Sequence, residues 1–200
     1  MDRRTLLRAL AALPLAAAPL AALAQDRTLT EVSKYLNQLR SVKGRFTQIN
    51  ANGSRSRGTY YLRRPGFIRF EYDGDAALVI ADGTNIGVFD AKSNTGAQKY
   101  PLGTTPLRLL LRDNIDLNEP GVSRGTSNDG TFTSVVLQDP RKPRDGSMTL
   151  TFSNRPPALK QWVVTEKSGQ KTTVVLETIE KTAGFDRDLF NIELAEIRRR

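Results

Sequence analysis

The sequence predicts a mainly β, α+β fold in which one antiparallel sheet is covered by two or three helices. Short segments of alternating apolar and polar residues follow one another, and turn dipeptides such as Asn52-Gly53 and Asp82-Gly83 separate them. Two apolar segments with helical spacing stand apart from these strands, one near the N-terminus and one in mid-chain. We count about eleven strands and find no internal repeat.

Composition excludes several kinds of site. The 200 residues include no Cys and no His, which rules out disulfides, thiol catalysis, Ser-His-Asp triads and histidine-based metal sites. No acidic loop has calcium-type spacing, so we expect no metal, no cofactor and no catalytic residue. The net charge of +9 fits nucleic acid, anionic lipid headgroups or a basic soluble surface.

Residues 1–24 predict a cleaved secretory signal. A basic start and an alanine-leucine run end at Ala22-Leu23-Ala24, an A-x-A cleavage site. Arg3-Arg4 also resembles a twin-arginine signal, so Sec and twin-arginine export both stay open. We expect residues 25–200 to form one domain in the periplasm, where no nucleic acid partner is expected.

The first element of this domain is predicted as a helix from about 28 to 40. Thr28 and Glu31 have the spacing of a capping box at its start. One apolar face then carries Leu29, Val32, Leu36 and Leu39. With one apolar face, the helix is expected to cover the sheet.

The remaining elements follow from alternation and turns. Strands are predicted at 45–50, 58–63, 67–72, 76–81, 84–90, 96–100, 132–138, 147–153, 159–166, 172–180 and 189–197. Between them, Thr105 and Pro106 begin a short apolar helix over 105–112, with threonine as its cap and proline in its first turn. Residues 113–130 are predicted as a loop.

The most unusual stretch joins the second and third strands. Pro65 has no backbone N–H, so the ladder must break at Arg64-Pro65-Gly66. A charged residue there lies beside the apolar face formed by Ile68, Phe70 and Tyr72. A sheet of this many strands must curl. Its inner face is then either a dry core or a cavity for an apolar ligand, and the pattern alone leaves both open.

Several motifs occur together in a defined order. They are Phe46-Thr47-Gln48, Arg64-Pro65, Asp82-Gly83, Thr105-Pro106 and Trp162-Val163-Val164. On these residues, the chain from 28 to 197 resembles the LolA-type outer-membrane lipoprotein carriers of Gram-negative bacteria.

The resemblance implies an unclosed antiparallel β-barrel with helices as a lid over a hydrophobic cavity. It also implies transport without catalysis. An inner-membrane ABC-type transporter would hand over a triacylated lipoprotein, the carrier would shield its acyl chains across the periplasm, and an outer-membrane acceptor or lipid would take them. The resemblance favours a monomer.

The resemblance also implies site residues. Arg64 is the lid latch, an arginine that hydrogen-bonds lid carbonyls; the alternative is a surface ion pair at a strand end. The cavity positions are Phe46, Tyr60, Leu62, Ile68, Phe70 and Tyr72. The lid positions are Leu36, Leu39, Leu107, Leu110 and Leu111. For all of these leucines and aromatics, the alternative is ordinary core packing.

Two features depart from the resemblance, and other functions remain open. Arg108 places a charge inside the second lid segment, where an apolar residue is expected. Arg63 and Arg69 make the region around Arg64 basic, which suggests contact with anionic lipid.

The alternative functions are a carrier or sensor of another lipid and an envelope module that docks a protein segment. A hydrolase is disfavoured because no nucleophile has a base beside it.

Overall fold

The computed structural model describes residues 20–74, 77–90 and 96–199, and of residues 20–27 the backbone alone. Most of the predicted signal, residues 1–24, therefore lies outside the described residues. No helix in the described ranges is both long enough and apolar enough to cross a membrane.

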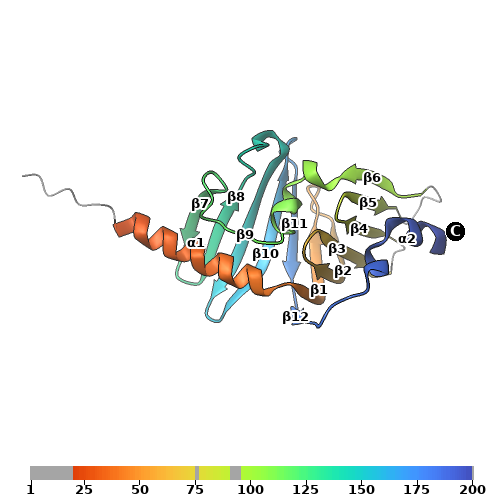
Figure 1. The fold of residues 1–200 in the computed structure, drawn as a ribbon, viewed down its shortest axis with the longest axis horizontal. Helices are drawn as coiled ribbons and strands as arrows, with labels where there is room; N and C mark the ends of the chain where they lie inside the picture. Colours follow the sequence, from red (N-terminus) through yellow and green to blue (C-terminus); the bar gives the residue numbers. More distant parts are fainter. Residues whose placement is uncertain (1–19, 75–76, 91–95, 200) are drawn as a thin grey trace, which may run out of the picture.

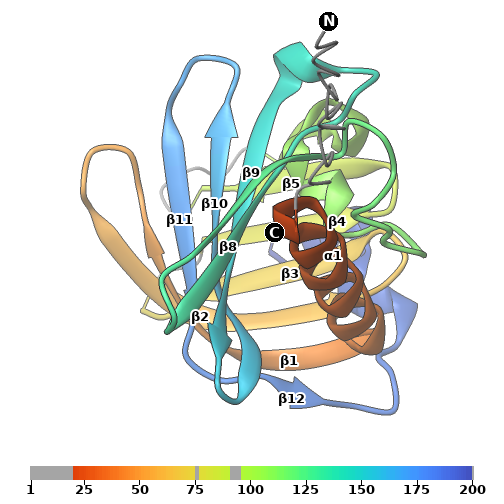
Figure 2. The same ribbon diagram turned by 90° about the vertical axis from the view of Figure 1, so that its left-hand side faces the viewer.

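One sheet of twelve antiparallel strands forms the body of the molecule. The strands are β1 (Ser41–Ile49), β2 (Arg55–Arg63), β3 (Phe67–Tyr72), β4 (Leu78–Asp82), β5 (Asn85–Phe89), β6 (Gln98–Pro101), β7 (Ser123–Asn128), β8 (Phe132–Leu137), β9 (Gly146–Asn154), β10 (Pro157–Glu166), β11 (Lys171–Leu176) and β12 (Glu180–Lys181). Their order is β6-β5-β4-β3-β2-β1-β11-β10-β9-β8-β7, with β12 beside β1. The two ends of this order do not pair with each other, and the sheet curls around a hollow (Figures 1 and 2). This confirms the expected unclosed barrel.

Strand β1 joins the two halves of the sheet. It pairs with β2 along its length, with β11 from Phe46 to Ile49 and with β12 at Val42 and Lys43. At Gly44, between these two partners, a Cβ atom would lie 1.9 Å from the carbonyl oxygen of Thr178. Only glycine lets the chain after β11 approach β1 this closely.

Helix α1 (Leu20–Gln38) lies across the hollow of the sheet (Figures 1 and 2). It begins upstream of residue 28, so Thr28 and Glu31 lie inside the helix and the predicted capping box is wrong. It ends at Gln38, and Leu39 follows with its N–H donating to Leu36 at 3.0 Å. The apolar residues before Thr28 also favour a helix, so the sequence gives no sign of where the helix begins.

The second lid segment is less regular than predicted. In place of a helix over 105–112 there are two 3-10 turns, η1 (Leu102–Thr104) and η2 (Pro106–Leu109). Pro106 occupies the first turn as expected, but Thr105 does not cap it. The Thr105 hydroxyl instead donates to the carbonyl of Leu102 at 3.0 Å.

Strand β7 lies inside the stretch predicted as a loop. Its sequence SRGTSN has no apolar alternation, because β7 is an edge strand in which no residue is buried. A register shift between Ser123 and Gly125 also interrupts its pairing with β8. Edge strands of this kind carry almost no hydrophobic signal.

The strand predicted at 189–197 is wrong. The chain forms a 3-10 turn η4 (Arg187–Phe190) and a short helix α2 (Ile192–Arg198). Asn191 caps α2, its side-chain oxygen accepting from the N–H of Leu194 at 2.9 Å. The apolar spacing of Ile192 and Ala195 is helical, and both are buried. The remaining 3-10 turn, η3 (Pro143–Asp145), lies between β8 and β9.

Two hydrophobic cores lie on opposite faces of the sheet. The larger core fills the hollow between the sheet, α1 and the segment from Leu102 to Val122. The smaller core lies where η4 and α2 cover β4 and β5 on the outer face. Arg63 donates to the carbonyl of Phe185 at 2.9 Å, and Arg69 donates to that of Leu189 at 3.0 Å. These arginines therefore hold the C-terminal segment. The suggested contact of this region with anionic lipid stays a prediction.

Candidate functional site

The six predicted cavity positions all belong to the larger core. Phe46, Tyr60, Leu62, Ile68 and Phe70 are buried, and Tyr72 is half-buried against the same core. Strand alternation brings them together, since Tyr60 pairs with Phe70 and Leu62 with Ile68 across β2 and β3. The Phe46 ring makes edge contacts with Phe70 and Tyr72, at centroid distances of 5.0 and 5.4 Å.

The predicted lid positions face these residues from the other side. Leu36, Leu39, Leu110 and Leu111 are buried in the larger core, and Leu107 is half-buried against it. Whether they act as a lid or only as core is a question of movement, so their role stays a prediction.

Side chains nearly fill the space where α1 and the segment around Leu110 meet the sheet. An internal cavity of about 20 Å³ remains. It is lined by Leu36, Leu39, Val42, Tyr60, Leu62, Arg64, Leu110, Ile115, Leu159, Trp162, Leu176 and Ile179. Ligand pockets usually measure about 300–1,000 Å³. This cavity is therefore too small for an ordinary ligand unless the segments that cover the sheet move away from it.

Arg64 connects both lid segments to the sheet. It follows β2, and its side chain is 6% exposed. Its guanidinium donates to the carbonyls of Leu36, Leu39 (3.1 Å) and Arg112 (3.3 Å), and to the side-chain oxygen of Asn37 (3.4 Å). The Leu36 and Leu39 carbonyls lie at the C-terminal end of α1, where the helix dipole favours a cation. A planar, multi-donor cation suits this arrangement of carbonyls.

The backbone around Arg64 reinforces this connection. The N–H of Arg64 donates to the carbonyl of Arg40 at 2.8 Å, and the N–H of Gly66 donates to that of Leu111 at 2.9 Å. Burial, and then repulsion from Arg40, lower the pKa of Arg64 to about 10, while Asp113 acts in the opposite direction. Arg64 is therefore still charged at neutral pH, with its charge compensated by carbonyl dipoles.

Sequence reasoning missed the polar contacts between the two lid segments. Asn37 pairs reciprocally with the backbone of Ile115, donating to its carbonyl at 2.8 Å and accepting from its N–H at 3.0 Å. One turn earlier, Ser33 accepts from the N–H of Leu117 at 3.0 Å. The signal was present, because Ser33 and Asn37 are four residues apart beside the apolar stripe. These contacts therefore join the two predicted lid segments to each other.

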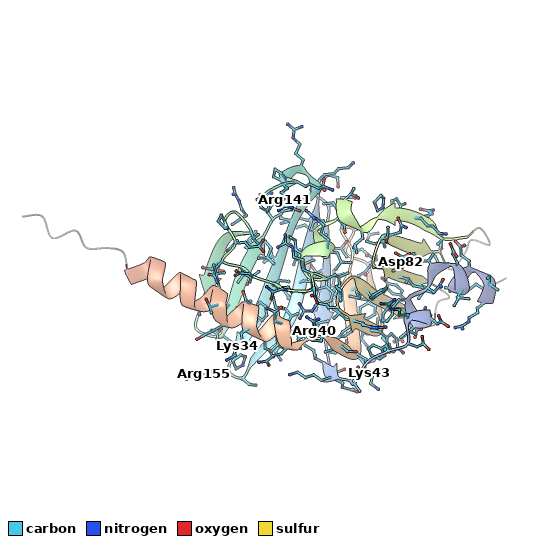
Figure 3. The ribbon with its side chains drawn as sticks, viewed as in Figure 1. Lys34, Arg40, Lys43, Asp82, Arg141 and Arg155 are labelled. Carbon is cyan, nitrogen blue, oxygen red and sulfur yellow. The ribbon has the colours of Figure 1, made fainter. Side chains whose placement is uncertain are left out.

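An open groove lies beside the closed interior. It has a volume of about 680 Å³ and separates α1 from the β7–β8 and β9–β10 turns. Lys34 and Arg155 lie at this side of the molecule in Figure 3 and line the groove. At its inner wall, Tyr35 makes an edge contact with Phe152 and accepts a hydrogen bond from the N–H of Leu159 at 3.0 Å. Leu159 also lines the internal cavity, so Tyr35 separates groove from cavity.

Arg108, the charge that departs from the expected pattern, has a partner. Its guanidinium pairs with Asp139, whose side chain is 6% exposed, in the connection between β8 and β9. Burial lowers the pKa of Arg108, and Asp145 offsets this in part. Nearby, Lys142 donates to the carbonyl of Gly103 at 2.9 Å. The second lid segment is therefore fixed at this end by charged side chains, while Arg64 fixes its other end.

Within the described ranges, no group of three or more acidic residues is arranged to hold a metal ion. The chain consists of an open antiparallel sheet with an apolar inner face, closed by two lid segments. This arrangement defines the class of lidded half-barrels.

The comparisons assign the family. The family model described as outer membrane lipoprotein carrier protein LolA matches residues 37–193, and the chain belongs to this family.

Individual relatives are distant. The chain is 28% identical to an outer-membrane lipoprotein carrier protein of Chromohalobacter salexigens, over 90% of this chain and 89% of the relative. Among solved structures, it is similar to a putative outer membrane lipoprotein-sorting protein domain from Vibrio parahaemolyticus, with 8% identity, a TM-score of 0.49, and coverage of 86% of this chain and 99% of that one. It is also similar to a Pseudomonas aeruginosa MucA/MucB complex chain, with 17% identity, a TM-score of 0.41, and coverage of 84% and 60%.

Proposed function

We propose that this protein is a periplasmic carrier that shields lipoprotein acyl chains from water, and that it has no catalytic activity. The observation that supports this most directly is the lidded interior. Its walls are apolar, while the lid is attached by polar contacts centred on Arg64. The family description and the name of the Chromohalobacter relative agree with this role.

The physical basis is the cost of exposing acyl chains to water. Each buried methylene contributes about 0.8 kcal/mol, so long chains need continuous cover between two membranes. In the proposed cycle, the Arg64 contacts break, α1 and the segment from Leu102 to Val122 leave the sheet, and acyl chains replace the lid leucines. The groove beside Tyr35 is the proposed entrance, since Tyr35 lines the groove and its hydroxyl accepts a hydrogen bond from the N–H of Leu159, which lines the internal cavity.

Localisation and processing are part of the proposal. Residues 1–24 act as a signal that is removed after Ala24, by Sec or twin-arginine export. Helix α1 would then begin at Gln25 and retain the residues that face the core. An inner-membrane ABC-type transporter supplies triacylated lipoproteins, and an outer-membrane acceptor or lipid receives them from the monomeric carrier.

The test is a release assay with purified residues 25–200 and spheroplasts of the host. We expect soluble one-to-one complexes with lipoproteins. An Arg64→Leu variant should take up lipoproteins but fail to pass them on, because its lid no longer closes over the emptied interior. Arg63→Leu is the matched control: Arg63 adjoins Arg64 but its guanidinium binds Phe185 on the outer face.

Trp162 provides a second readout. It is the only tryptophan of the chain and lines the internal cavity. A brominated fatty acid that enters the interior should quench its fluorescence. Quenching without lipoprotein release would identify another lipid as the cargo. If there is neither quenching nor release, the interior is a dry core and the proposed function is wrong.

A further inference from the structure

One end of the sheet collects cations that are far apart in the sequence. The β1–β2, β10–β11 and β8–β9 connections follow one another at the same end of six neighbouring strands, in the order β2-β1-β11-β10-β9-β8. Figure 2 shows the last two of these connections side by side at the top. These connections and the strand residues that directly follow them carry six exposed cations, here called the basic rim: Arg55, Arg141, Lys142, Arg144, Lys167 and Lys171.

The charge of the basic rim is largely uncompensated. Among the described residues, no rim cation forms an ion pair within 4.0 Å, whereas Arg40, Arg45 and Lys43 elsewhere each have a carboxylate partner. The three connections contain the carboxylates Asp139, Asp145 and Glu166. Asp139 is already paired with Arg108.

The shape of the basic rim indicates the kind of partner. With strands about 4.8 Å apart, a row across six strands is about 24 Å long. Figure 3 shows Arg141 at the end of the molecule, with its side chain pointing away from it. Among residues whose side chains the structure describes, the exposed large hydrophobic ones are Tyr100, Phe132 and Ile197, and none of these three lies on these connections. Protein interfaces are usually rich in aromatic residues and poor in lysine at their centre.

We propose that the basic rim is a peripheral docking surface for anionic phospholipid headgroups. A long row of flexible cations without an apolar anchor fits a fluid, negatively charged surface, which it approaches without inserting into it. Docking by this rim would also bring the second lid segment to the membrane, since Lys142 and Asp139 contact Gly103 and Arg108. The inference does not depend on the cargo, so it can fail while the proposed function stands, and the reverse.

Vesicle co-sedimentation of the purified protein, residues 25–200, tests the proposal. One set of vesicles is neutral phosphatidylcholine; the other contains about a quarter phosphatidylglycerol. We expect binding to the anionic vesicles only, and weaker binding as salt is raised. Each cation at a membrane surface contributes about fivefold in affinity.

Two variants with equal loss of charge separate a local surface from net charge. The rim variant is Arg141→Gln, Arg144→Gln, Lys167→Gln and Lys171→Gln. The control variant is Lys160→Gln, Lys181→Gln, Arg187→Gln and Arg198→Gln. All eight positions are exposed, so both proteins should fold.

The rim variant should lose binding by about two to three orders of magnitude, and the control variant by less than about tenfold. Equal losses in the two variants would overturn the proposal, because net charge alone would explain them. If the unaltered protein ignores anionic vesicles at low salt, the proposal is also overturned, and the rim cations would instead suit an acidic protein surface.

Discussion

Arg64 shows how one side chain can control a large apolar interface. The hydrophobic contacts between lid and sheet have no direction, whereas the Arg64 hydrogen bonds require a defined position of two separate segments. Breaking them exposes a cation and carbonyl groups to water, which solvates both well. The closed lid is therefore specified by contacts whose loss water partly compensates, and opening does not require a large penalty at this point.

The buried Tyr60 and the half-buried Tyr72 make the stability of the fold depend on pH. Burial raises the pKa of Tyr72 to about 12, against a smaller opposite effect of its hydrogen bond to Gln48, and burial also raises the pKa of Tyr60. Between pH 10 and about 12 the unfolded chain loses these protons and the folded chain keeps them. Their contribution to stability is therefore complete below pH 10 and decreases as pH rises.

We expect this to steepen alkaline unfolding. Between pH 10 and 12, the Tyr72→Phe variant should lose less stability than the unaltered protein, as measured by urea unfolding at fixed pH. The matched control is Tyr100→Phe, at an exposed tyrosine. An unchanged slope in the Tyr72→Phe variant would mean that Tyr72 ionises equally in both states.

At the level of elements, the mid-chain lid segment depends on the Arg108–Asp139 pair. Asp139→Asn would remove the carboxylate that pairs directly with the Arg108 guanidinium, at a site where Asp139 is 6% exposed, and would leave only the weaker attraction of Asp145. We expect a loss of about 2–3 kcal/mol in the free energy of unfolding. Glu119→Gln, which breaks the exposed Arg112–Glu119 pair, should cost about 1 kcal/mol or less.

Hydrogen exchange distinguishes local from global effects of the Asp139→Asn change. Amides of Leu109, Leu110 and Leu111 should exchange faster, while those of β3 keep their protection. Equal costs of the two substitutions would show that the Arg108–Asp139 pair contributes no more than a surface ion pair.

The elements differ in how far the sequence predicted them. Strands β1 to β5 and β8 to β11 have a buried inner face and marked turns, so alternation located them. Strand β7 and the C-terminal helix α2 were missed, for different reasons. The edge strand β7 has no apolar pattern to detect, and α2 is too short for helical periodicity to exceed strand alternation.

In the candidate site, too, the sequence predicted some residues and contacts and missed others. Strand parity alone placed Ile68, Phe70 and Tyr72 on one face, while the resemblance supplied the positions on the lid. The contacts of Asn37 with Ile115 and of Arg108 with Asp139 join segments at least 31 residues apart. The spacing of Ser33 and Asn37 beside the apolar stripe marks a polar face on the helix, but local patterns do not identify the partner residue of such a long-range polar contact.

For the whole molecule, the two cores imply that stability and fatty-acid binding can be changed separately. The outer core around Phe190 is fully separated from the hollow by the sheet, and Phe190 is 1% exposed. We expect Phe190→Ala to lower the free energy of unfolding by about 3–5 kcal/mol. Fatty-acid binding, measured by Trp162 quenching where the variant is folded, should be unchanged.

Phe70→Ala is the matched substitution in the larger core, where Phe70 is 6% exposed. It should be destabilising by a similar amount and should also change fatty-acid affinity, because it enlarges the hollow. A change of affinity in the Phe190→Ala variant would show that the C-terminal segment and the interior are coupled through the sheet.

The near absence of empty space in the interior has a consequence for how tightly cargo is held. In the proposed function, the lid leucines that already occupy the hollow act as a tethered competitor for the acyl chains. The net binding free energy is then the difference between two similar terms: the free energy of burying the acyl chains and the free energy of burying the leucines. Such a carrier would bind its cargo weakly. A slightly higher affinity of the acceptor membrane for the acyl chains would then be enough for transfer.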